Sequence, residues 1–372
     1  MYIIYNVKEA VINVKRIPKI VLSGGPGGGK SKALRYLKES LSNEGFTVYT
    51  IEESATSVLE SGFSRSCTAL EFQHKIALLQ LMRENELDKV VADDEKSVII
   101  CDRGLMDCRV YLDDEDYEKI KSILGMTDVE LRDRYDAVFH LNSTSTDEHL
   151  KYKTGDIRTE NREEARSINE RSLRAWCGNP HYRFIPTKET FDEKYELLLR
   201  EVKAFLGIPK PLEIERKFLI EYPDLKLLSS LVCAKTEIEQ IYLTKNDNRY
   251  RLRKRGYYGN YIYIRTEKKK ISETVREEVE TRLSEDEYYS QLMDGDVTGR
   301  IFKSRYCLMY DGVYYEIDIF PFWKKQAYLE VELLDENDEV KLPEFIKVIR
   351  EVTGDSAYKN SSLCQKIPDE DV

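Results

Sequence analysis

Histidine and paired cysteine are scarce in this chain, which limits its metal chemistry. Its 372 residues include four histidines and seven cysteines, and neither set has the spacing of a zinc site. The cysteines are odd in number and form no Cys-x-x-Cys pair, so we expect reduced thiols in a cytoplasmic setting. Any metal chemistry is therefore expected to use oxygen ligands.

Long apolar segments are also missing. No apolar run approaches the roughly 18 residues that a membrane-spanning helix needs, and Met1–Arg16 lacks the pattern of a signal peptide. The sequence contains no internal repeat and no low-complexity segment. The net charge of −10 argues against general coating of nucleic acid, and we expect no DNA partner. The length is sufficient for two domains, each with its own core.

A motif for phosphate binding lies near the N-terminus. Lys19–Ser23 has the pattern of a buried strand, and a helical pattern begins near Lys30. The intervening loop matches Gly-x-x-x-x-Gly-Lys-Ser in its required strand–loop–helix context. Backbone N–H groups of such a loop surround a β-phosphate, the lysine reaches the β- and γ-phosphates, and the serine ligates Mg²⁺. The predicted nucleotide ligands are Gly24, Gly25, Gly27, Gly28, Gly29, Lys30 and Ser31.

Acidic residues follow two further predicted strands. Asp102 ends the apolar segment 98–102 and is expected to hold Mg²⁺ or to accept a substrate proton. With Arg103 and Asp107, it resembles the corresponding segment of small-molecule and nucleoside kinases. Glu52 and Glu53 follow the segment 47–51, where an acceptor substrate sits in many open α/β sheets. They are equally typical of acids that begin a helix.

A polar stretch before Trp176 contains Arg158 and Arg162. It resembles the arginine-bearing lid of such kinases, and we include both arginines among the predicted nucleotide ligands. A solvated helix explains the same charges equally well. The preferred base is left open between ATP and GTP, because the chain has no Asn-Lys-x-Asp motif for reading guanine.

The second half of the chain contains strands with charge on one face. In residues 212–220, alternation places Glu213, Glu215 and Lys217 on one face and mostly apolar residues on the other. One such strand would ordinarily have a solvated outer face. The pattern recurs with Arg249, Arg251, Arg253 and Arg255; Arg276, Glu278, Glu280 and Arg282; Lys303 and Arg305; Glu316 and Asp318; and Glu330 and Glu332. The repetition indicates a closed antiparallel sheet with a charged interior.

The segment Glu213-Ile214-Glu215-Arg216-Lys217 matches the ExExK signature of the CYTH, or triphosphate tunnel metalloenzyme, superfamily. With the charged strands that follow, the resemblance covers about residues 210–367. It implies an eight-stranded antiparallel tunnel that binds triphosphate with a divalent metal. Members hydrolyse inorganic triphosphate, thiamine triphosphate, nucleotides or RNA 5′-triphosphate ends, and others make cyclic AMP.

Crowded charges in such an interior require neutralisation by metal and polyanion. Oxygen-only ligands favour Mg²⁺ or Mn²⁺. The predicted metal ligands, besides Ser31, are Glu213, Glu215, Glu278, Glu280, Asp318, Glu330 and Glu332. The predicted polyphosphate ligands are Lys217, Arg249, Arg251, Arg253, Arg276, Arg282, Lys303 and Arg305. Catalysis is assigned to Glu213, Glu215, Lys217 and Glu330.

These patterns divide the chain into an α/β domain and a β domain. We predict an N-terminal extension at 1–16, a parallel P-loop domain of the nucleoside-kinase type at 17–206, a hinge at 207–211, a CYTH tunnel at 212–367 and a tail at 368–372. This order resembles proteins similar to the TRPL translocation defect protein. The resemblance implies a nucleotide-binding protein that also binds phosphoinositide in membrane-protein trafficking. Plant fusions of a kinase and a tunnel have pyrophosphatase activity, so the order alone does not select a reaction.

Three functions therefore compete. The first is metal-dependent hydrolysis of tripolyphosphate or nucleoside triphosphate in the tunnel, with ATP or GTP at the P-loop. The second is a binding module that senses nucleotide and holds a phosphoinositide headgroup at a membrane surface. The third is a small-molecule kinase with a regulatory tunnel. The retained carboxylates Glu213, Glu215, Glu330 and Glu332 favour the first, because a headgroup binder mainly needs cations. An RNA 5′-triphosphate end is a further partner that we leave open.

Overall fold

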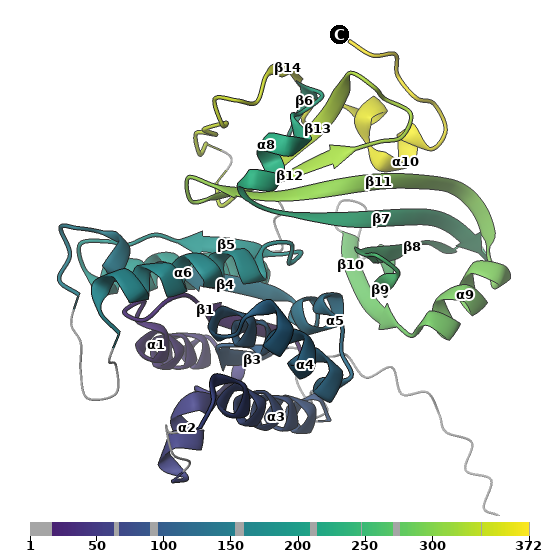
Figure 1. Ribbon diagram of the computed structural model, residues 1–372. Coiled ribbons are helices and arrows are strands. Elements are labelled where there is room, and N and C mark those ends of the chain that lie inside the picture. Colours follow the sequence, from purple (N-terminus) through teal and green to yellow (C-terminus); the bar gives the residue numbers. More distant parts are fainter. Residues whose placement is uncertain are drawn as a thin grey trace, which may run out of the picture.

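The structure, a computed structural model, consists of two sheets with their covering helices (Figure 1). It describes residues 17–62, 67–89, 96–152, 160–208, 214–246, 248–270, 276–335 and 337–371; for residues 268–270 and 276–279 only the backbone is described. None of the described helices is long and apolar enough to cross a membrane. The expected combination of a parallel α/β unit and an antiparallel β unit is confirmed.

The N-terminal domain is built on a five-stranded parallel sheet in the order β2-β3-β1-β4-β5. Its strands are β1 (Lys19–Ser23), β2 (Thr47–Ile51), β3 (Ser97–Asp102), β4 (Ala137–Leu141) and β5 (Tyr182–Ile185). Strands β1, β3 and β4 are apolar on both faces and completely buried. Such strands need helices on both faces of the sheet.

Helices supply that cover. On one face, α1 (Lys30–Asn43) and α7 (Phe191–Phe205) form an apolar cluster with the sheet. On the other lie α3 (Ala69–Asp88), the 3₁₀ helix η1 (Leu105–Tyr111), α4 (Asp114–Leu124), α5 (Asp128–Asp133) and α6 (Arg162–Trp176). Two short elements, α2 (Ser54–Glu60) and η2 (Thr144–Thr146), follow β2 and β4.

The C-terminal domain is built on one antiparallel sheet in the order β10-β9-β8-β7-β11-β12-β13-β6-β14. Its strands are β6 (Ile214–Glu221), β7 (Val232–Lys245), β8 (Asn248–Tyr257), β9 (Asn260–Lys270), β10 (Arg276–Leu283), β11 (Asp296–Tyr310), β12 (Val313–Ile319), β13 (Gln326–Leu333) and β14 (Val348–Glu351). The described helical elements of this domain include α8 (Leu225–Ser230), η3 (Ser356–Tyr358) and α10 (Asn360–Leu363). The sheet therefore has nine strands where eight were expected, because the short β14 extends it beyond β6. Within the described residues β10 and β14 are the two edges of the sheet, so no hydrogen-bonded ladder closes it there.

One face of this sheet is mainly apolar and is covered by α8 and α9 (Glu285–Asp294). Leu329 and Val331 of β13 pack with Phe218 in a cluster beneath α8. At the other end of the sheet, α9 covers a second cluster through the buried Tyr288. The alternating charged residues consequently face the opposite side, as the period-two pattern predicts. That other face also has an apolar cluster at one end, where Leu219 and Tyr328 pack with residues of η3 and α10.

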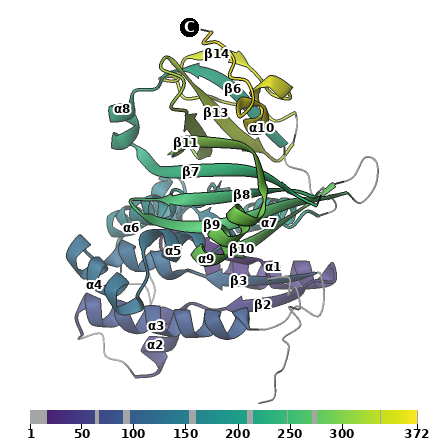
Figure 2. The ribbon, with the colours of Figure 1, turned by 90° about the vertical axis from the view of Figure 1, so that its right-hand side faces the viewer.

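The two domains lie against each other (Figure 2) and share a continuous apolar core. Trp176 and Cys177 of the N-terminal domain lie in the same apolar cluster as Cys307 and Tyr314 of the C-terminal sheet. The Tyr314 hydroxyl accepts a hydrogen bond from the backbone N–H of Gly178 at 3.1 Å and donates one to the carbonyl of Asn179 at 3.0 Å. The domains are thus held by buried contacts and not only by residues 207–211, of which 209–211 lie outside the described part.

Candidate phosphate sites

The P-loop, residues Gly24–Ser31, runs from the end of β1 into α1. Gly24, Gly27 and Gly29 have φ values of +126°, +81° and +86°, a region that favours glycine. A side chain on Gly24 would also place its Cβ 2.3 Å from the carbonyl oxygen of Leu141 at the end of β4. The loop conformation therefore depends on its glycines.

Lys30 is held inside the loop. Its Nζ donates to the carbonyl oxygens of Gly24 at 2.8 Å and Gly25 at 3.0 Å, and the residue is only 6% exposed. Burial, with the nearby Arg103 guanidinium, lowers the pKa of Lys30 to about 8. An ammonium held by two carbonyl oxygens can exchange them for phosphate oxygens, which are stronger acceptors.

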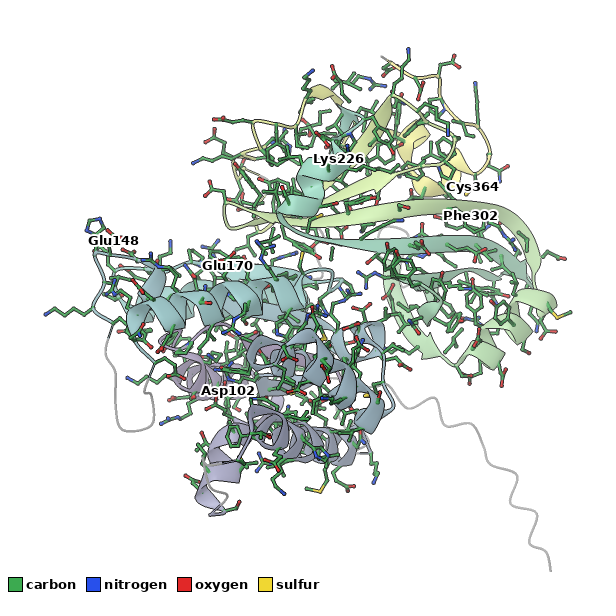
Figure 3. The ribbon with its side chains drawn as sticks, viewed as in Figure 1. Asp102, Glu148, Glu170, Lys226, Phe302 and Cys364 are labelled. Atoms are coloured by element: carbon green, nitrogen blue, oxygen red, sulfur yellow. The ribbon has the colours of Figure 1, made fainter. Side chains whose placement is uncertain are left out.

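Ser31 and Asp102 meet as the motif predicts, since the Ser31 hydroxyl donates to Asp102 Oδ2 at 2.7 Å. Asp102 is buried at the end of β3, within the N-terminal domain (Figure 3). Burial raises its pKa, and its buried Oδ1 has no hydrogen-bond partner. A hydroxyl and a carboxylate with a free oxygen are suitable donors for Mg²⁺.

A cavity of about 510 Å³ opens beside Lys30 and Ser31. Glu53 and Arg103 lie in its wall, with Arg103 Nε donating to Glu53 Oε1 at 2.7 Å. Burial alone would raise the pKa of Glu53, but Arg103 and Lys30 lower it to about 2. Glu53 also occupies the N-cap position of α2, although its side chain makes no capping hydrogen bond, and its role at an acceptor substrate stays a prediction. The remaining wall combines apolar residues of α2 and α3 with the amides of Gln73 and Gln80.

Several residues of the nucleotide site were not predicted. Lys194 of α7 donates to the carbonyl of Gly28 at 2.9 Å, and burial lowers its pKa to about 7. The side-chain oxygen of Asn169 accepts from the N–H of Gly25 at 3.0 Å. Neither residue belongs to a sequence motif, and both lie far from the loop in the sequence, so only the packing of α6 and α7 brings them to it. Gln73 and Gln80 could have been suspected from the sequence, because they are polar residues seven positions apart on the side of α3 that is buried.

The structure describes one of the two predicted lid arginines. Arg158 lies outside the described residues. Arg162 begins α6, and its guanidinium donates to the carbonyls of Asp147 at 3.0 Å and Leu150 at 2.6 Å. These contacts hold the segment after η2 and include no P-loop atom.

The second site lies on the side of the C-terminal sheet opposite α8 and α9, which we call the charged face. Glu330 of β13 contacts Lys217 at 2.7 Å and Arg305 at 2.6 Å. Asp318 of β12 contacts Arg305 Nε at 2.7 Å and pairs closely with Lys303. The residues of this face are Glu215, Lys217, Arg251, Arg253, Lys303, Arg305, Glu316, Asp318, Glu330 and Glu332.

These ion pairs are buried, so the pKa of each group depends strongly on the charge of its partner. Burial would raise the pKa of Asp318, but Arg305 and Lys303 hold it far below its ordinary value. Burial lowers the pKa of Lys303, and its partner Asp318 opposes that shift. Glu316, which pairs with Arg305, has a pKa raised by burial. The centre of the face is thus an array of positive and negative groups, Lys303, Arg305, Asp318 and Glu330, that is largely shielded from water.

The basic strand β8 extends the same face. Arg251 contacts Thr266 at 3.1 Å and Glu280 at 3.4 Å, and burial with the neighbouring Arg251 lowers the pKa of Arg253 to about 10. Arg249 lies at the exposed end of the strand. Arg282 reaches the domain boundary instead, where it donates to the Asp133 carbonyl and lies 3.6 Å from Asp136.

Three predicted ligands lie beyond what the structure describes: Glu213, and the side chains of Arg276 and Glu278. Within the described ranges, no group of three or more histidine, cysteine, aspartate or glutamate side chains is arranged to hold a metal ion. The carboxylates Glu330, Asp318 and Glu332 are instead paired with lysine or arginine. The available donors are oxygens, which fit Mg²⁺ or Mn²⁺ chemically.

Glu332 has an unexpected partner. Its carboxylate pairs with Arg183 of β5, a residue of the other domain. Nothing in the local sequence around Arg183 indicated this contact. It joins the end of the charged face to the N-terminal domain.

Comparisons with known proteins cover both halves of the chain. A family model described as an AAA domain matches residues 19–194, and one described as a CYTH domain matches residues 211–363. The two-part resemblance read from the motifs is thereby confirmed. No curated protein matches the chain, so the likeness to the TRPL translocation defect group stays a prediction.

Solved structures resemble parts of the chain. One, of the hypothetical protein NE1496, is 30% identical and covers 42% of this chain and 100% of its own, with a TM-score of 0.31. Another, described as the inorganic triphosphatase NE1496, is 28% identical over 42% of this chain and 97% of its own, with a TM-score of 0.30. NadR in complex with NR is 16% identical over 51% of this chain and 52% of its own, with a TM-score of 0.38. TM-scores this low do not establish an activity for this chain.

Proposed function

Because this chain joins an AAA domain to a CYTH domain, we propose that it binds ATP or GTP at the P-loop and hydrolyses tripolyphosphate or a nucleoside triphosphate on its charged face, with Mg²⁺ or Mn²⁺. The observation that carries the proposal is the buried array around Arg305. Its guanidinium contacts Asp318 and Glu330, and both carboxylates are buried.

Such an array is costly for a purely structural sheet. Each buried charge loses hydration, and well-packed apolar residues are often at least as stabilising as a buried ion pair. On the opposite face of the same strands, apolar side chains pack together and stabilise the sheet. A row of cations interleaved with carboxylates is instead suited to a polyanion with bound metal.

The residues have distinct tasks in this proposal. Lys217, Lys303 and Arg305 bind phosphate oxygens and fix the terminal phosphoryl group. Glu215 and Glu330 provide oxygen ligands, while Glu330 also orients Lys217 and Arg305 through its contacts at 2.7 and 2.6 Å. The metal, when bound, supplies positive charge that stabilises the charge developing on the phosphoryl oxygens.

Phosphate release tests the proposal directly. Tripolyphosphate, ATP and GTP are incubated with the full chain and Mg²⁺ or Mn²⁺, with and without chelator. We expect turnover that chelator abolishes. Glu330→Gln should reduce turnover more than tripolyphosphate binding, whereas Arg305→Ala should reduce binding itself by about 10- to 100-fold, the equivalent of one or two charge-assisted hydrogen bonds.

The matched control is Lys226→Ala, since Lys226 lies exposed on α8, on the covered side of the sheet (Figure 3). Thermal unfolding of each variant separates lost binding from lost folding. Tight binding of tripolyphosphate without turnover under either metal would exclude the hydrolase. It would favour the nucleotide-sensing module instead, and vesicles with and without phosphoinositide would then test its headgroup ligand.

A second candidate activity rests on the cavity beside the P-loop. Its wall brings Glu53 and Arg103 together with Lys30 and Ser31, and it also includes Gln73 and Gln80. A carboxylate near the γ-phosphate position could accept the proton of an attacking hydroxyl, and the volume of about 510 Å³ suits a small acceptor molecule. We propose a small-molecule kinase as the alternative for this domain.

Acceptor-dependent ADP formation distinguishes the two activities. A panel of small hydroxyl compounds is incubated with MgATP, and transferred phosphate is detected on the acceptor. Glu53→Gln should abolish the transfer while leaving phosphate release from tripolyphosphate unchanged, because Glu53 lies in the N-terminal domain. Absence of any acceptor-dependent ADP formation across the panel would count against the kinase.

A further inference from the structure

Two charged residues of the N-terminal domain form ion pairs with charged residues of the C-terminal sheet, one with a basic strand and one with an acidic strand. Asp133 of α5 contacts Arg255 of β8 at 2.5 Å, next to the basic row of that strand. Arg183 of β5 pairs with Glu332 of β13, at the end of the acidic row. Both contacts join elements of the N-terminal domain, α5 and β5, to the C-terminal sheet, and Figure 1 shows these two elements on the side of the N-terminal domain that lies next to that sheet. The carboxylate of Asp133 therefore lies against the basic strand β8, and the guanidinium of Arg183 lies against the acidic strand β13.

Arg183 is held firmly in this place. It lies on β5, which pairs with β4 through the register Phe139–Arg183, and its Nη1 donates to the carbonyl of Tyr182 at 3.3 Å. Glu201 of α7 lies 3.6 Å from its Nε. The side chain is 16% exposed, so few alternative positions in water are open to it.

The carboxylates around Arg183 form the acidic part of the face. A void of about 10 Å³, space for about one water molecule, is lined by Pro180, Arg183, Tyr314 and four glutamates: Glu215, Glu316, Glu330 and Glu332. Glu330 forms ion pairs with Lys217 and Arg305 of the sheet, and Arg305 also forms an ion pair with Glu316. Among the described residues that line the void, Arg183 is the one cation.

We propose that Arg183 is a resident counter-cation for the tunnel carboxylates, which occupies the position on Glu332 that a divalent cation would take. The N-terminal domain thereby restrains metal loading of the C-terminal site. The inference rests on the proposed function, in which these carboxylates receive Mg²⁺ or Mn²⁺. Arg183 and a divalent cation compete for the carboxylate oxygens of Glu332, so the paired guanidinium weakens metal binding there.

Titration of the full chain with Mn²⁺ tests this, with free Mn²⁺ followed by its electron paramagnetic resonance signal. Removing the guanidinium in Arg183→Gln should increase Mn²⁺ affinity by about two- to fivefold, the worth of one partly exposed ion pair. Arg183→Lys, which keeps the charge, should change it less. In Arg183→Gln/Glu332→Gln the gain should vanish, which assigns it to Glu332 and not to Ser31 and Asp102.

Arg174→Gln is the matched control. Arg174 also crosses the boundary, donating to the backbone carbonyl of Leu231 at 3.1 Å, but its ion pair is with Glu170 of its own helix. Its Mn²⁺ affinity should equal that of the unchanged chain. Equal or weaker Mn²⁺ binding by Arg183→Gln, in a protein with unchanged thermal unfolding, would overturn the inference alone. If neither chain binds Mn²⁺ beyond the Ser31 site, the proposed metal-dependent hydrolysis fails together with it.

Discussion

At the scale of single residues, Lys30 joins the P-loop conformation to nucleotide binding. Its ammonium donates to two loop carbonyls and is the charge nearest the expected phosphates. Lys30→Ala should weaken ATP and GTP binding by about 100-fold, because about 3 kcal/mol of charge-assisted hydrogen bonding is lost. Calorimetry of the full chain measures this. Lys38→Ala, on the exposed side of α1, is the control, and equal affinities in the two variants would remove the assignment.

His140 gives the stability of the protein a dependence on acid. The ring is fully buried and stacks on Phe184 at 5.8 Å, and burial, with Lys30 and Lys194 nearby, lowers its pKa to about 3. The unfolded chain binds this proton below its ordinary pKa of about 6.5, whereas the folded chain does not. The free energy of unfolding should therefore fall as pH drops from about 6.5 toward 3, by up to about 1.4 kcal/mol per pH unit.

Urea unfolding between pH 4.5 and 8 measures that slope. His140→Phe keeps an aromatic ring beside Phe184 and removes one titrating group. Its slope should be shallower by about one proton but not zero, because burial also lowers the pKa of His181. Identical slopes for the two proteins would show that His140 takes up its proton in the folded chain at its ordinary pKa.

At the scale of elements, α5 is fixed to the C-terminal sheet by a buried carboxylate. Asp133 contacts Arg132 at 2.7 Å and Arg255 at 2.5 Å. Burial would raise its pKa, but these two arginines lower it. Asp133→Asn leaves the guanidinium groups without their counter-charge and should lower the free energy of unfolding by about 3 kcal/mol.

Urea unfolding of this variant is compared with that of Asp114→Asn. Asp114 lies on the adjacent helix α4, is 97% exposed and contacts Arg109 at 3.5 Å. Its replacement should cost less than about 1 kcal/mol, as for other surface ion pairs. A loss as small for Asp133 would mean that the arginines find water or other partners when the carboxylate is gone.

At the scale of the whole molecule, the shared core predicts cooperative unfolding of the two domains. Cys307, Met309 and Tyr314 of the C-terminal sheet pack with Trp176 and Cys177 in one cluster. We expect a single calorimetric transition for the full chain. MgATP at about 100 times its dissociation constant should stabilise that transition by about 2.7 kcal/mol. Two separate transitions, of which MgATP shifts only one, would show that the domains unfold independently.

Local patterns in the chain predict most of the site at the level of residues. The P-loop is recognisable because Gly24, Gly27 and Gly29 adopt backbone angles that glycine favours, in a fixed spacing before Lys30 and Ser31. The faces of the C-terminal strands are recognisable because side chains on a strand alternate with a period of two. The alternation places Lys217, Arg305, Asp318 and Glu330 each on the charged side of its own strand, and their ion pairs show that these sides form one face.

The sequence by itself therefore determined the two fold types, the phosphate loop and the charged face. Only the tertiary structure decided what lies between the domains. Arg183 meets Glu332, and Asp133 meets Arg255, across separations of 149 and 122 residues. The physical reason is that glycine conformations and strand alternation are set by near neighbours in the chain. A contact between two domains depends instead on how complete elements pack, and no short pattern records it.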